Sequence, residues 1–310
     1  FTGPTGLSGI TPALAPSAPD NSLLITYGTF DDPLNRASRV DLLFTVSVTT
    51  DPFADGLFLT NQVRQHEGST NAGETETDVI IQIQVQEPLL FFTKGVGATS
   101  SPTGAFTPPQ VAPPGVTFNP PGSNPSWSGL VNSSGLAAQL IDSDLAGVDA
   151  GDLATFALVI ENQGSSPHGA FDIRLRDLLA PGYVIPGTGT GLNLQIRRGN
   201  GDAISFQALN TAGSAVGAPN TNPEYLFYDV GLNRGGLELL DPSDDEGVCQ
   251  GYDLGDGANI VILTYDLQLA PGVEPGDVIT NTASVTQYAS RNGGPNFLDS
   301  GGPLTDTAQV

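Results

Sequence analysis

Apolar and polar residues alternate along most of this chain with a period of two. The pattern runs through five segments: 40–48, 79–86, 154–160, 171–177 and 261–269. In segment 171–177, for example, apolar residues at 171, 173 and 175 alternate with charged residues at 172, 174 and 176. A period of two is typical of β-strands that bury one face. We therefore expect strands over all five segments.

Turn signals separate these segments. The chain contains 39 Gly and 25 Pro, with clusters such as 180–182 and 270–272 lying between the alternating stretches. Gly accepts positive φ and Pro removes a backbone donor, so both favour turns over long helices. Only short stretches such as 136–145 are candidates for a helix. The pattern predicts an all-β fold built as an antiparallel sandwich.

Three segments near the start match three later segments in the same order. The pairs are 21–28 with 223–231, 39–63 with 259–285, and 75–85 with 303–310. An ordered repeat of this kind predicts tandem units. We therefore interpret 1–87 as the C-terminal half of a β-sandwich repeat and 88–310 as a complete or nearly complete one.

The second unit contains a long insertion at 97–140, rich in Pro, Gly, Ser and Asn. Such a stretch is unsuited to a sheet interior. We expect an exposed arm, pinned by Trp127, the chain's one Trp. It either contacts a neighbouring subunit or is a loop or linker without that role.

The net charge of −23 narrows the choice of partners. It opposes binding to nucleic acid and to anionic membrane surfaces. The sequence has no apolar stretch long enough for a transmembrane helix, and the lone Cys249 excludes a disulfide within the chain. The start, Phe1-Thr2-Gly3-Pro4, has neither Met nor a signal segment. We expect a processed or excised piece from an extracellular, cell-surface protein.

Segment 150–185, AGDLATFALVIENQGSSPHGAFDIRLRDLLAPGYVI, resembles the conserved repeat of large prokaryotic surface proteins. The repeat reads roughly a-G-D-x-v-x-y-x-i-x-v-x-N-x-G and ends a later strand in D-x-L-P-x-G. Segment 276–286, GDVITNTASVT, is similar to its closing strand. The same pattern recurs in the isopeptide-forming fimbrial domains of pilins and adhesins. The insertion at 97–140 and the long segment 186–222 depart from it.

This resemblance implies immunoglobulin-like β-sandwich domains in tandem, displayed outside the cell, without catalytic turnover. The residues agree with a non-enzyme. His66 and His168 both lie in polar, turn-like contexts, and no G-x-S-x-G occurs. Among 33 acidic residues, however, close carboxylate pairs of the glycosidase type stay possible.

Two acidic loops offer hard oxygen ligands of the kind that Ca²⁺ prefers. They span 142–152 and 241–257, and neither matches the twelve-residue calcium loop. The alternative is a solvated acidic loop without metal. Calcium is the one candidate cofactor, and the second loop is the better site for it through Asp241, Asp244, Asp245, Asp253 and Asp256.

Lys94, Asp177 and Asn281 form the most specific candidate site. Lys94, the one Lys of the chain, alternates in phase with Leu90, Phe92 and Val96, and Asp177 and Asn281 likewise extend apolar faces. Polar groups that point into one apolar core must meet or be neutralised. In the fimbrial relatives, such a Lys and Asn join as an amide next to an acid. The alternatives are a hydrogen-bonded Lys94–Asp177 pair, or a Lys94 that reaches solvent at the strand end.

These observations predict a structural subunit of an extracellular filament, sheath or surface layer. Its expected partner is itself, in a head-to-tail homopolymer with possible strand exchange, because the half repeat lacks its opening strands. The alternative is an adhesin or carbohydrate-binding module that uses aromatic residues such as Trp127, Tyr183 and Tyr225. We expect no nucleic acid partner and no membrane insertion.

Overall fold

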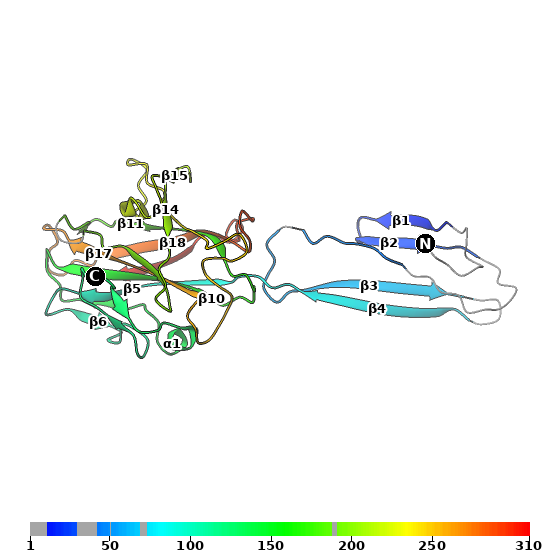
Figure 1. The fold of residues 1–310 in the computed structure, drawn as a ribbon, viewed down its shortest axis with the longest axis horizontal. Helices are drawn as coiled ribbons and strands as arrows, with labels where there is room; N and C mark the ends of the chain where they lie inside the picture. Colours follow the sequence, from blue (N-terminus) through cyan, green and yellow to red (C-terminus); the bar gives the residue numbers. More distant parts are fainter. Residues whose placement is uncertain (1–10, 30–41, 50, 69–72, 188–190) are drawn as a thin grey trace. The chain divides into compact units, whose positions relative to one another are not determined.

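The computed structural model describes residues 11–29, 42–49, 51–68, 73–187 and 191–310. The interpretation of Phe1–Pro4 as a processed end lies outside these residues. The chain divides into two compact units, Phe1–Thr49 and Thr50–Val310. Figure 1 shows the elements of both units.

The described residues of the first unit form one antiparallel pair of strands, β1 (Ala13–Ser17) and β2 (Ser22–Thr26). Asn21 closes the turn between them with a φ of 46°, a conformation that Asn tolerates better than most residues. Residues 42–49 form no strand, so the strand expected over 40–48 is wrong for its described part. A strand needs a partner for its backbone groups, and none is paired with these residues; Leu43 is 98% exposed.

The second unit begins with a hairpin of two ten-residue strands, β3 (Phe58–Glu67) and β4 (Thr75–Gln84). The strands pair antiparallel, with Asn61 opposite Ile81 and Val63 opposite Val79. Within the described residues neither strand joins a larger sheet. The strand expected over 79–86 is therefore present, although its partner is limited to β3.

Two larger sheets make up the rest of the second unit (Figure 1). One has the order β12-β17-β10-β5, with β13 also paired to β17; the other has the order β15-β14-β16-β11-β18-β19. The strands of the first sheet are β5 (Leu90–Thr99), β10 (Leu153–Asn162), β12 (Tyr183–Val184), β13 (Gln195–Arg198) and β17 (Ile260–Leu269). Those of the second are β11 (Phe171–Leu178), β14 (Phe206–Leu209), β15 (Ala215–Val216), β16 (Gly236–Leu239), β18 (Thr280–Ala289) and β19 (Leu304–Gln309). The strands expected at 154–160, 171–177 and 261–269 are confirmed as β10, β11 and β17.

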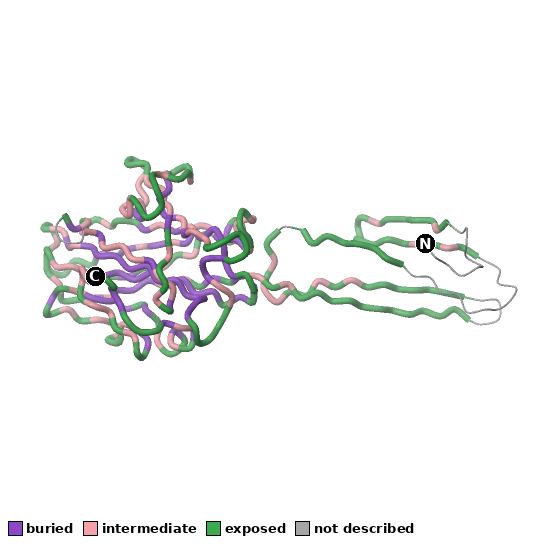
Figure 2. The backbone as a smooth tube through the Cα atoms, viewed as in Figure 1, coloured by how far each residue is buried: buried purple, intermediate pink, exposed green. Residues whose placement is uncertain are grey.

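One apolar core joins these two sheets. β10 and β17 supply Phe156, Leu158, Val261 and Leu263, and they pack in one cluster with side chains of β11 and β18 such as Ile173, Leu175 and Val285. Figure 2 shows this buried backbone as the purple strands in residues 88–310. The described part of residues 11–87 contains no buried residue, and burial begins at Pro88. Burial thus begins at residue 88, whereas the two compact units meet at Thr49 and Thr50.

The insertion at 97–140 is not an exposed arm, contrary to our expectation. Trp127 is only 4% exposed, and it packs with Val131 and Ile141 against Val159 and Ile262, which belong to β10 and β17. A second apolar cluster therefore covers the outer face of the five-stranded sheet. Because β10 and β17 also carry apolar side chains on this outer face, among them Val159 and Ile262, they need this cover, which the period-two pattern could not reveal.

The predicted start of the insertion is also wrong, because residues 97–99 belong to β5. The elements that follow within the insertion are short. β6 (Ala105–Thr107) pairs with β9 (Asp144–Ala146), and β7 (Thr117–Phe118) pairs with β8 (Trp127–Ser128). The helix expected within 136–145 occurs earlier, as α1 (Ser133–Ala138), where Asn132 caps the amide of Gly135. A 3₁₀ turn, η1 (Pro223–Leu226), precedes β16. The all-β prediction is confirmed, and no helix in the described residues is long and apolar enough to cross a membrane.

Candidate functional site

The polar candidates Lys94, Asp177 and Asn281 meet inside the core, as their strand phases predicted. Lys94 lies on β5, opposite Leu158 of β10, and its side chain is fully buried. Asp177 lies on β11 opposite Ala283 of β18, and both Asp177 and Asn281 are fully buried as well. The group therefore bridges the two sheets. A Lys94 that reaches solvent at the strand end is ruled out.

Direct hydrogen bonds connect the group. The Lys94 Nζ lies 2.5 Å from Asp177 Oδ2 and 3.0 Å from the hydroxyl of Tyr265 on β17. The Tyr265 hydroxyl donates a short hydrogen bond to the same Asp177 oxygen. Asn281 Nδ2 donates to the Tyr265 hydroxyl at 3.3 Å. One hydroxyl thus contacts the amine, the acid and the amide nitrogen.

Burial favours the uncharged form of each ionisable group here. Desolvation lowers the pKa of Lys94 and raises the pKa of Asp177, although the attraction between them opposes both shifts. The pKa of Tyr265 lies well above its ordinary value because burial and the neighbouring Asp177 both disfavour the phenolate. Apolar rings line the amine, with Nζ 5.3 Å from the centre of the Phe156 ring. The structure thus contains the hydrogen-bonded Lys94–Asp177 pair given above as an alternative, and burial shifts the pKa of each partner toward its uncharged form.

Two oxygens of the group have no hydrogen-bond partner among the described residues. They are Asp177 Oδ1 and Asn281 Oδ1, both buried. Ionised, Asp177 would leave two buried acceptors unsatisfied, which costs stability. A proton on Asp177 Oδ1 would turn that oxygen from an acceptor into a donor, so one unsatisfied acceptor fewer would remain buried. The two unsatisfied oxygens therefore agree with a protonated Asp177. A neutral amine, a carboxylic acid and an amide carbonyl are the groups needed to form a new amide.

Tyr265 is the member that sequence reasoning missed as a functional residue. In segment 261–269 it alternates in phase with leucine and valine, and its ring packs in the core, stacked on Phe156 at 5.6 Å and edge-on to Phe227. The available signal was its hydroxyl. A buried Tyr needs a hydrogen-bond partner, and the buried polar candidates were the natural ones.

A second Asn lies in the matching position of the β3–β4 hairpin. Asn61 faces Ile81 across the hairpin, as Asn281 faces Ala308 across β18 and β19. The side chains that flank Asn61 on this face are apolar: Leu59, Val63, Val79, Ile81 and Ile83. We call them, with Asn61, the hairpin face. Within the described residues of the second unit it is covered by nothing that buries it, with Val79, Ile81 and Ile83 each more than half exposed.

The five aspartates proposed for calcium are not brought together. No group of three or more potential metal ligands occurs in the described part of the chain. Asp241 instead accepts the backbone amides of Asp172 and Val248, and Asp253 accepts those of Gly255 and Asp256. The remaining contacts are of the same kind: Asn292 donates to Asp244, the Asp245 carbonyl contacts His168, and Asp256 accepts from Ala258. Calcium binding stays a prediction without a coordination site.

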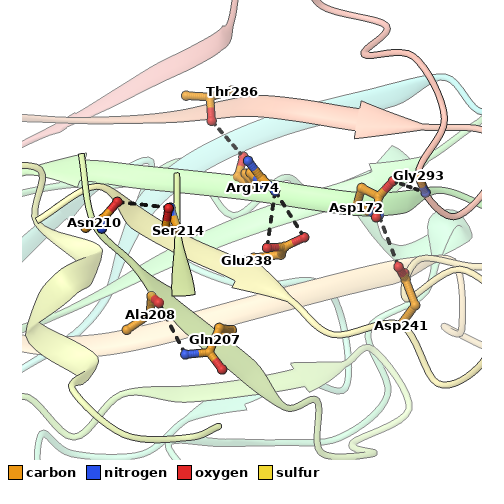
Figure 3. Close-up of polar contacts among 10 residues, drawn as sticks. All are labelled: Asp172, Arg174, Gln207, Ala208, Asn210, Ser214, Glu238, Asp241, Thr286 and Gly293. Atoms are coloured by element: carbon orange, nitrogen blue, oxygen red, sulfur yellow. Dashed lines mark hydrogen bonds and ion pairs between the residues drawn. The ribbon is translucent and has the colours of Figure 1, made fainter. Parts of the chain in front are cut away.

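Figure 3 shows the Asp241 contact in place. Asp172 lies at an irregularity of β11 with a φ of 53°, its amide donating to Asp241 and its carboxylate accepting from Gly293. Burial raises the pKa of Asp241 to about 6, while the two backbone amides that it accepts oppose the rise. These carboxylates therefore hold loops against the sheet.

The residues considered for catalysis and for sugar binding are also dispersed. His66 contacts Glu74 on the exposed hairpin, whereas His168 contacts the Asp245 backbone. Trp127 and Tyr183 are each only 4% exposed, so the prediction that they form an exposed sugar-binding surface is wrong. Both were needed to fill apolar clusters.

No family model and no curated protein matches the chain. Among solved structures, a family 123 glycoside hydrolase from Clostridium perfringens, studied for glycolipid glycan hydrolysis, is similar in part. The identity is 13% and the TM-score 0.19, and the match covers 52% of this chain and 21% of that chain. A likeness this weak supports neither a shared fold nor a shared activity.

Proposed function

We propose that this chain is a non-catalytic structural subunit of an extracellular filament, sheath or surface layer, assembled head to tail from immunoglobulin-like β-sandwich repeats. The observation that carries the proposal is the uncovered hairpin face. Apolar patches of a few hundred Å² on soluble proteins mark interaction sites. An unpaired strand edge such as that of β3 also invites strand addition.

The partner of this face is a second copy of the chain. In residues 88–310, which we call the two-sheet part, the matching face of β18 and β19 is buried by the opposite sheet, with Asn281, Val285 and Ala308 fully inaccessible. The described strands that would cover the hairpin face in the same way, β5, β10 and β11, are already occupied in their own sheets. A neighbouring molecule can supply strands without disrupting that core. Contacts between unlike surfaces extend into linear arrays unless rotation closes them.

The Lys94 group gives such a subunit mechanical strength. The proposal includes an amide between Lys94 Nζ and Asn281 Cγ, which forms with the release of one ammonia. The bond joins β5 of one sheet to β18 of the other, so a pulling force would pass through covalent bonds. The chain has no disulfide to serve this purpose, since its one cysteine is the buried Cys249.

Two adjacent isoleucines of β4 test the assembly. Ile81 belongs to the hairpin face, whereas Ile80 is opposite Gln62 on the other face and is similarly exposed, at 59% against 54%. We expect the wild-type chain and Ile80→Asp to form concentration-dependent polymers in sedimentation velocity and electron microscopy. Ile81→Asp should stay monomeric. Wild-type monomers at high concentration, or equal behaviour of both variants, would contradict the proposal.

Intact mass tests the covalent bond. The bonded chain is lighter than its sequence mass by one ammonia, and Asp177→Ala should restore the full mass. An unmodified wild-type mass ends this part of the proposal and leaves the assembly test unaffected, because the two rest on different residues.

A further inference from the structure

The hydroxyl of Tyr265 occupies the position through which a proton must travel if the Lys94–Asn281 amide forms. It accepts from Lys94 Nζ at 3.0 Å and from Asn281 Nδ2 at 3.3 Å. The first nitrogen must lose a proton when it attacks, and the second must gain one when it leaves. Within the described residues, the Asn281 side chain has no other hydrogen-bond partner.

We infer that Tyr265 is the proton relay of this reaction, passing a proton from Lys94 Nζ to Asn281 Nδ2. The inference rests on the amide proposed above and separates two roles. Asp177 polarises the Asn281 carbonyl as a neutral acid, and Tyr265 moves the proton to the leaving group.

The step balances in atoms and electrons. The lone pair of the neutral Lys94 amine forms a bond to Asn281 Cγ. In the structure the Tyr265 hydroxyl donates to Asp177 Oδ2, so it must turn toward Nδ2 for the transfer. Nζ then gives one proton to the Tyr265 oxygen, and the hydroxyl gives its own proton to Nδ2. The Cγ–Nδ2 bond breaks, the carbonyl reforms, and ammonia leaves. Tyr265 and Asp177 end in the protonation states in which they began, so no oxidant, reductant or metal is required.

The surroundings of Tyr265 require both transfers to be coupled. Its ring is fully buried between Phe156 and Phe227. A free phenolate is costly there, because burial and Asp177 hold the pKa of this hydroxyl far above its ordinary value. The hydroxyl must therefore receive one proton as it releases the other.

Tyr183 provides a matched control. Its ring lies edge-on to Phe156 with 5.5 Å between ring centres, and it is nearly as buried as Tyr265. Its hydroxyl, however, has no hydrogen-bond partner among the described residues. Tyr183→Phe and Tyr265→Phe thus both remove one buried hydroxyl from the same aromatic cluster, and only the second removes a contact to the reacting atoms.

The experiment follows ammonia loss in the full chain. Chain isolated in the unfolded state, before the amide has formed, is refolded, and samples are quenched over time. Intact mass gives the rate of bond formation, with near-UV circular dichroism as the check on folding. We expect Tyr183→Phe to react at the wild-type rate. Tyr265→Phe should react about 10²–10⁴-fold more slowly, the usual effect of losing a positioned proton-transfer group.

Each outcome is decisive. If Tyr265→Phe forms the bond as fast as wild type, the relay is overturned and the bond stands. If wild type never loses ammonia, both are overturned. Should Tyr265→Phe fail to fold, the wild-type rate in mixtures of H₂O and D₂O replaces it. Two coupled transfers give a curved dependence on the deuterium fraction, and a straight line would rule out the relay.

Discussion

The hairpin β3–β4 and the hairpin β18–β19 are two versions of one element in opposite environments. Each places an Asn opposite an apolar residue, Asn61 with Ile81 and Asn281 with Ala308. Yet β18 gains a second strand partner, β11, and a facing sheet, whereas β3 pairs within the described residues with β4 alone. The difference shows that the hairpin's own sequence fixes its pairing and its apolar face. Whether that face is buried depends on strands from elsewhere.

The sharpest test of this comparison places a carboxylate two residues after each Asn. Ala283 is 1% exposed, so Ala283→Asp buries a charge without a partner, at a cost of about 3–5 kcal/mol or more. Val63, on the hairpin face, is 37% exposed. In dilute monomer, Val63→Asp should therefore change the free energy of unfolding by less than about 0.5 kcal/mol. Chemical denaturation followed by near-UV circular dichroism measures both.

The contrast fails if the two substitutions cost the same. Equal large losses would mean that the hairpin face is already covered within a single chain. In that case the proposed assembly surface would not exist.

The two asparagines give the next largest contrast. Asn281→Ala removes the proposed amide, and a cross-link that closes so long a loop typically contributes about 2–4 kcal/mol. It should also abolish the ammonia loss seen by mass. Asn61→Ala should leave the ammonia loss and the thermal unfolding of the monomer unchanged, because Lys94, the one Lys of the chain, is bonded to Asn281 in this proposal. Thermal unfolding of the two variants side by side checks this, and an equal loss of stability in both would refute the assignment of the bond to Asn281.

Much of this fold could be predicted from periodicity, because in a strand with one buried face the alternation of apolar and polar residues shows which side chains point into the core. Lys94, Asp177 and Asn281 were found together because each continued an apolar phase, and an apolar core cannot leave such groups separate. The same reasoning failed for residues 42–48, whose alternation is as clear as that of β10. Strand formation there depends on a partner that local sequence does not specify.

The insertion and the tyrosine were missed for a related reason. Pro and Gly in 97–140 correctly excluded a long strand, but they did not show that Trp127 covers the outer face of β10 and β17. That face carries apolar residues such as Val159 and Ile262 beside polar ones, so the alternation predicted burial of the inner face alone. Tyr265 was counted as core because its ring is core, and only its hydroxyl carries the chemistry.

The smallest expected effect concerns pH, and it contrasts a partly buried carboxylate of the two-sheet part with one on the hairpin. Burial raises the pKa of Asp241 to about 6, above the value of about 4 for an unfolded chain. Between these values the native state binds more protons than the unfolded state, so this group's contribution to stability falls as pH rises from about 4 to about 6. Because Asp241 is only partly buried, we expect this change in the free energy of unfolding to be at most about 2 kcal/mol.

Asp241→Asn should remove this component, whereas Asp78→Asn, on the exposed hairpin, should not. Urea unfolding at several pH values measures each variant against wild type, which cancels the general repulsion of a chain of charge −23. A pH dependence that is the same in wild type and Asp241→Asn would mean that this carboxylate is solvated, and that the loops at β11 are held by other contacts.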